Sequence, residues 1–87
     1  MKRKAGFVLQ TIGEESYAVA VTQDAAKVGS MIRLNPTGAF LFAYLEKERT
    51  EEDCILALLA RYDIDRSTAE ADVSRFLAGL RGADLLA

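Results

Sequence analysis

The sequence predicts an α+β protein in which a three-stranded antiparallel sheet is followed by three helices. β-Favouring residues separated by turn residues are concentrated in the N-terminal third. Helix formers with capping residues make up the rest of the chain. No repeat, low-complexity tract or change of composition divides the chain, so we expect residues 1–87 to form a single domain.

A β-hairpin is predicted at the N-terminus, with strands over Gly6–Ile12 and Ser16–Val21. The connection Gly13-Glu14-Glu15 contains glycine and has a length that is typical of a hairpin. Along the second strand, bulky and small side chains alternate and so lie on opposite faces. The bulky residues are Tyr17, Val19 and Val21, and the small ones are Ala18 and Ala20. We expect the bulky face to be buried.

A short third strand is predicted over Met31–Leu34, after a loop at Thr22–Ser30. The loop is polar, ends in Gly-Ser and lacks strand alternation. Along the strand, Ile32 and Leu34 should face the core, and the two residues that alternate with them should face the other way.

The first helix should begin at Asn35-Pro36 and run to about Lys47. Asparagine can cap the free N–H groups of a helix, and proline fits the first helical position because no donor is needed there. Apolar residues between Phe40 and Leu45 cover more than one stripe. A helix of this kind is buried on two sides, so we expect it to be central.

Capping signals also mark the second and third helices. Thr50, followed by acidic residues, should start the second helix, and either Asp65 or Ser67 should start the third, which should end at Gly82. The expected inward-facing residues of these helices are Ile55, Leu58, Leu59 and Tyr62, then Ala69, Val73, Phe76, Leu77 and Leu80. Leu85 and Leu86 can fold back onto the core.

The composition argues against an enzyme, a metal site and a cofactor. The chain has one cysteine and no histidine, which excludes a disulfide framework and metal sites built from those ligands. Cys54 has no histidine to activate it and lies beside an apolar helix face, so we expect it to pack in the core. The glycines form no phosphate-binding motif.

Neither a membrane nor a secreted location is indicated. The basic N-terminus, MKRK, is followed by a short alternating run instead of the apolar segment of a signal peptide, and no stretch is long enough to span a bilayer. We therefore expect a cytoplasmic protein.

Nucleic-acid binding is the main alternative function, because three helices beside a small sheet are also the elements of a winged-helix protein. The charge pattern argues against it. Arg66, Arg75 and Arg81 are interleaved with Glu70 and Asp72, and the formal net charge is −2.

The third strand offers a different kind of site. Its brevity and the helix that follows at once predict an unpaired sheet edge, to which an extended peptide can add as another strand. An edge covered by the chain's own loop or by a second copy in a homodimer remains the alternative.

Four segments together resemble the PqqD family, which is named for its member in pyrroloquinoline quinone biosynthesis. They are Met31–Phe40, Arg49–Glu52, Arg61–Asp65 and Ala69–Val73, and the resemblance extends over nearly the whole chain. Phe42 stands where many relatives have tryptophan, which leaves its expected core role intact.

The resemblance implies a winged-helix-like domain that binds the leader of a ribosomally made precursor peptide. The peptide would add to the third strand, in a groove shared with the third helix, beside a radical SAM enzyme or another modifying enzyme such as a leader peptidase. The implied strand contacts are Met31, Ile32, Arg33 and Leu34, with Arg33 available to an acidic leader side chain. The implied helix contacts are Asp72, Arg75, Phe76 and Gly79.

Overall fold

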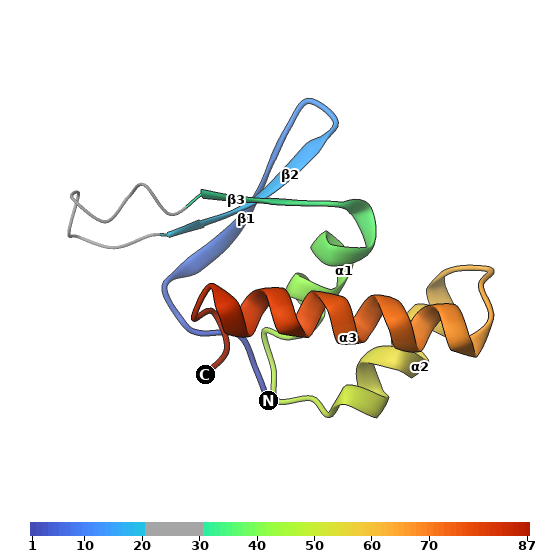
Figure 1. Cartoon of the computed structure of the whole chain (residues 1–87). Coiled ribbons are helices and arrows are strands. Elements are labelled where there is room, and N and C mark those ends of the chain that lie inside the picture. Colours follow the sequence, from blue (N-terminus) through green and yellow to red (C-terminus); the bar gives the residue numbers. More distant parts are fainter. Residues whose placement is uncertain (21–30) are drawn as a thin grey trace.

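The computed structural model describes residues 1–20 and 31–87 of the chain and confirms the predicted order of elements. These are β1 (Phe7–Ile12), β2 (Glu15–Ala20), β3 (Met31–Leu34), α1 (Pro36–Tyr44), α2 (Glu51–Arg61) and α3 (Arg66–Gly82). The strands form one antiparallel sheet in the order β1-β2-β3. In Figure 1 the sheet lies on one side of the long helix α3, and α2 lies on the other. The predicted loop over Thr22–Ser30 lies outside the described residues.

The hairpin between β1 and β2 is tighter than predicted. Ile12 lies opposite Glu15, so the loop holds only Gly13 and Glu14. Gly13 has a φ of 65°, in the left-handed region that glycine adopts without strain. Glycine at the first position of a two-residue loop suits a type II′ turn, whose twist matches that of the strands. Glu15 therefore belongs to the ladder and not to the connection.

The buried face of β2 is the small one, so the predicted burial of its bulky face is wrong. Ala18 is fully buried and Ala20 is 8% exposed, whereas Tyr17 and Val19 are only partly buried on the opposite face. Helix α1 packs against the alanine side of β2 and supplies the bulk of the core there. Small side chains on the sheet let the helix come close. Val21, the third residue of the predicted bulky face, lies outside the described residues.

Helix α1 starts as predicted and ends earlier than predicted. The Asn35 side chain accepts a hydrogen bond of 2.7 Å from the Gly38 N–H, and Pro36 occupies the first turn. The helix ends at Tyr44 and not near Lys47. After it, the carbonyl of Leu45 accepts a 2.9 Å hydrogen bond from the Arg3 N–H. The N-terminal segment thus takes the acceptor that a longer helix would use.

Hydrogen bonds identify the residues that cap α2 and α3. Thr50 and Asp53 form a reciprocal capping box, with the Asp53 N–H donating to Thr50 Oγ1 over 3.0 Å and the Thr50 N–H donating to Asp53 Oδ2 over 2.8 Å. Of the two caps considered for α3, Asp65 is the one used, because it accepts a 2.8 Å bond from the Thr68 N–H. Ser67 lies inside the first turn.

The core lies between the sheet and the helices. Its largest fully buried side chains are Phe42, Leu41, Leu45, Leu58, Leu77, Val73 and Cys54. Leu85 is 2% exposed, which confirms that the C-terminal residues fold back onto the core. Within the described residues, no helix has the length and apolar character to cross a membrane.

Candidate functional site

A cavity of about 250 Å³ separates β3 from α3. One wall is formed by β3 together with the first turn of α1, and another is formed by one face of α3. β3 and α3 run in opposite directions (Figure 1). We call this cavity the β3–α3 groove.

All the predicted site residues except Met31 line the groove. Ile32, Arg33 and Leu34 come from β3. Asp72, Arg75, Phe76 and Gly79 come from α3. The flank of α3 that the resemblance implied is therefore the one that faces β3. Met31 lies outside the lining and is 50% exposed.

Other lining residues were not predicted. Thr37 and Gly38 come from the first turn of α1, and Ala83 and Leu85 come from the end of α3 and the segment after it. Ala83 lies one helical turn beyond Gly79, so the helical period could have indicated it. Leu85 had no such signal, because its position depends on the chain folding back after α3.

Phe76 closes the groove toward α1. A Cβ placed on Gly38 would lie 3.2 Å from Phe76 Cε1, so the ring rests against the backbone of α1. Phe76 is only partly buried, and its other surface lines the groove. Gly79, one turn further along α3, has open space where a side chain would be. The lining of the groove is thus bulky at Phe76 and open at Gly79.

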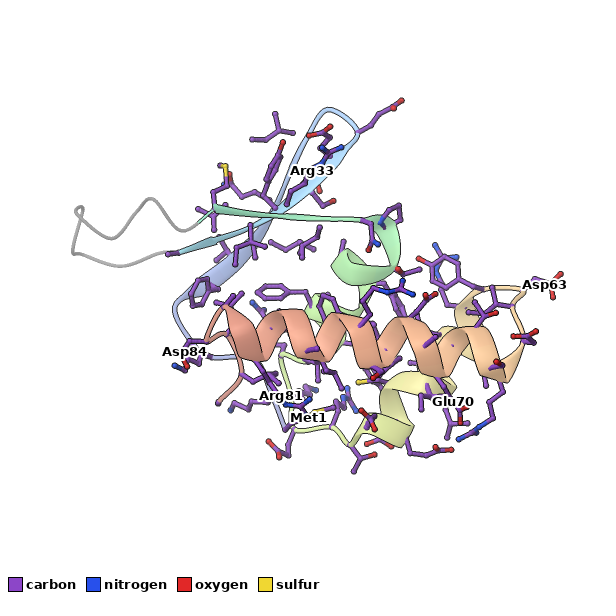
Figure 2. The ribbon with its side chains drawn as sticks, viewed as in Figure 1. Met1, Arg33, Asp63, Glu70, Arg81 and Asp84 are labelled. Carbon is purple, nitrogen blue, oxygen red and sulfur yellow. The ribbon has the colours of Figure 1, made fainter. Side chains whose placement is uncertain are left out.

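The residue Arg33 belongs to the groove lining, but its side chain is directed toward the outer face of the sheet. Its Nη2 lies 2.8 Å from Glu15 Oε1, and the Tyr17 hydroxyl donates a 2.5 Å bond to Glu15 Oε2. This bond is the main reason that the pKa of Tyr17 lies above its ordinary value. Figure 2 shows the Arg33 side chain on the side of β3 that is turned away from α3.

A second ion pair lies on α3 at the groove. Arg75 Nη1 is 3.4 Å from Asp72 Oδ1, with the Arg75 side chain 77% exposed and that of Asp72 28% exposed. An exposed pair of this kind contributes little to stability, since water screens it. Breaking this pair to contact a ligand would therefore cost little.

The outer edge of β3 has no strand partner among residues 1–20 and 31–87, since β3 is the last strand in the sheet order. An edge of this kind presents backbone N–H and C=O groups that another chain can bind. Here the edge runs along the groove, so a strand added to β3 would have one face toward α3.

Cys54 has no place in this site. Its side chain is fully buried between α2 and the core, and burial is the main cause that raises the pKa of its thiol. A raised pKa keeps the thiol protonated and unreactive. The described residues contain no cluster of three or more side chains that could hold a metal ion.

The sequence profile of one family, described as "Coenzyme PQQ synthesis protein D (PqqD)", matches residues 7–86. The chain belongs to the PqqD family. A similar solved structure is described as "TbiB1 in Complex with the TbiA(beta) Leader Peptide". The two sequences are 28% identical, the match covers 99% of this chain and 94% of that chain, and the TM-score is 0.75. No curated protein matches this PqqD-family chain.

Proposed function

We propose that this PqqD-family chain binds the leader segment of a ribosomally made precursor peptide and presents it to a modifying enzyme. The observation that carries the proposal is the free edge of β3, which runs along a groove walled by α3. The similarity to TbiB1, whose structure is titled as a leader-peptide complex, supports it.

The leader would bind as a fourth strand of the sheet. Each backbone hydrogen bond adds about 0.5–1.5 kcal/mol net, so a few bonds alone give weak binding. Apolar side chains that enter the groove would add the rest. The proposed contacts are those implied by the resemblance: Met31, Ile32, Arg33, Leu34, Asp72, Arg75, Phe76 and Gly79.

The basic residues support peptide binding over nucleic-acid binding. Arg66 is held between Glu52 and Glu70, at 2.5 and 3.0 Å, and Lys4 pairs with Asp84 at 2.8 Å. Arg3 stacks on the Phe42 ring, 4.4 Å from its centroid. The neighbouring carboxylates lower the local positive potential around Arg66 and Lys4, whereas phosphate binding is favoured by a continuous basic surface.

The chain would act without chemistry of its own, as a single domain that carries the leader in the cytoplasm. The partner would be a radical SAM enzyme or another peptide-modifying enzyme such as a leader peptidase. A homodimer that pairs two β3 edges would compete with the leader for the same backbone groups, so leader binding should weaken as the protein concentration rises if such a dimer forms.

A titration tests the proposal. The probe is a synthetic peptide with the leader sequence of the precursor encoded beside the gene for this chain, added to ¹⁵N-labelled protein. We expect the largest amide shifts in β3 and on the groove face of α3. Shifts confined to α2, or an absence of binding, would contradict the proposal. Duplex DNA serves as a second probe, and a steep salt dependence of its binding would favour the nucleic-acid alternative.

A further inference from the structure

The β1–β2 hairpin determines which backbone groups of β2 face β3. In a two-residue hairpin loop, the residues on either side of the loop are hydrogen-bonded to each other, and here these are Ile12 and Glu15. Hydrogen-bonded and non-hydrogen-bonded pairs then alternate along an antiparallel ladder. Tyr17, two residues beyond Glu15, therefore also directs its backbone groups to β1. Ser16 and Ala18 direct theirs to β3.

The same alternation continues into β3. Ser16 lies opposite Leu34, and Ala18 lies opposite Ile32. Ile32 and Leu34 therefore use their N–H and C=O groups to bind β2. Met31 and Arg33 direct their backbone groups toward the free edge. Within residues 1–20 and 31–87, those groups have no backbone partner outside the sheet.

We propose that a peptide added to β3 forms its hydrogen bonds to β3 through the backbones of Met31 and Arg33, and that only its side chains level with Ile32 and Leu34 enter the groove. This inference rests on the proposed function and specifies its geometry. It divides the β3 contacts into two residues that bind through the backbone and two that pack through side chains.

The outer face indicates the chemistry of the peptide's remaining side chains. Val8, Val19 and Met31 form one cross-strand row on this face, and Val8 and Met31 are 42% and 50% exposed. A peptide side chain level with Met31 would extend that apolar row. The next position on this face is level with Arg33, whose side chain is 70% exposed and pairs with Glu15 at 2.8 Å, so an acidic peptide side chain there would share the guanidinium with Glu15. The ligand class is therefore an extended segment with an acidic residue at the position level with Arg33 and apolar residues at the positions level with Met31 and Ile32.

Proline at residue 33 tests the backbone assignment. Proline has no N–H and is tolerated in an edge strand where that N–H faces outward. The matched control is Arg33→Ala, which removes the same side chain and keeps the N–H. With the neighbouring precursor's leader as probe, we expect Arg33→Pro to bind about tenfold more weakly than Arg33→Ala. Equal affinities of the two folded variants, with the wild type binding, would overturn the inference and leave the proposed function standing.

Hydrogen exchange in the free protein tests the alternation without a ligand. The amides of Ile32 and Leu34 should exchange slowly, and those of Met31 and Arg33 should exchange quickly and become protected when the leader is added. The reverse pattern in the free protein would overturn the inference even if the leader binds. If the wild type does not bind the leader at all, the proposed function and the inference both fail.

Discussion

A Cβ on Gly38 would lie 3.2 Å from Cε1 of Phe76 and 2.8 Å from Oδ1 of Asn35. Both contacts are closer than ordinary van der Waals separation, and the one to Phe76 shows that α1 and α3 approach each other here because residue 38 has no side chain. The contact holds the Phe76 ring where it lines the groove. It links the cap of α1, the packing of α3 and the shape of the proposed site.

Gly38→Ala should destabilise the protein despite its helical position. Alanine gains up to about 1 kcal/mol over glycine in a helix, but overpacking costs about 1–3 kcal/mol, and the new methyl group also presses on the Asn35 cap. Urea unfolding measures the net loss. The control is Gly79→Ala, which meets open space and should be stabilising. A Gly38→Ala variant as stable as this control would contradict the packing described here.

Filling the open space at Gly79 in the groove should weaken leader binding. Gly79→Leu places a bulky side chain where the groove is open, and we expect about a tenfold loss of affinity, which corresponds to about 1.4 kcal/mol. Gly82→Leu is the matched control, because Gly82 also has open space around it but does not line the groove. Calorimetric titration of both folded variants with the leader measures the difference. Equal losses would mean that the leader does not pack against Gly79.

The Tyr17–Glu15 hydrogen bond should be visible in an alkaline titration. The Glu15 carboxylate raises the pKa of Tyr17, so the folded pKa lies above the unfolded one. The stability that this bond contributes is therefore full below the ordinary tyrosine pKa of about 10 and is lost as the pH rises through the folded pKa. Glu15→Gln should lower the pKa of Tyr17. Phenolate absorbance measures this pKa, and the Tyr17→Phe variant identifies which part of the absorbance belongs to Tyr17. An equal pKa of Tyr17 in the wild type and in Glu15→Gln would contradict the hydrogen bond.

The use of Asp65 as the cap of α3 should make the free energy of unfolding depend on pH in the acidic range. The Thr68 backbone N–H holds the pKa of Asp65 below its ordinary value. The contribution of Asp65 is therefore present above the ordinary aspartate pKa of about 4 and is lost as the pH falls through the folded pKa. Asp65→Ala should lower the urea midpoint at neutral pH more than at pH 3. Ser67→Ala, at the other position considered for the cap, should change the midpoint little at either pH.

The sequence alone was sufficient for the order of the elements and for most of their ends. Asn35-Pro36 and Thr50 act on backbone groups within three residues, so their effect is readable from the local sequence. For α3 the sequence left Asp65 and Ser67 as alternatives, and the hydrogen bond from Thr68 decides for Asp65. The end of α1 was not predictable in this way, because the carbonyl of Leu45, just after the helix, is bound by Arg3, more than forty residues earlier in the chain. The helix side of the groove required the family resemblance, since α3 has two polar flanks of similar composition.

Two features of the sheet were decided only by the tertiary structure. The strand pattern of β2 shows that its faces differ, but the alanine face is buried because α1 brings its own large side chains to that side. Likewise, the residues of β3 that offer backbone groups to the free edge follow from the register of three strands and the length of one turn. A strand's faces and its hydrogen-bonding edges acquire their roles from partners distant in sequence, so the strand's own residues do not specify them.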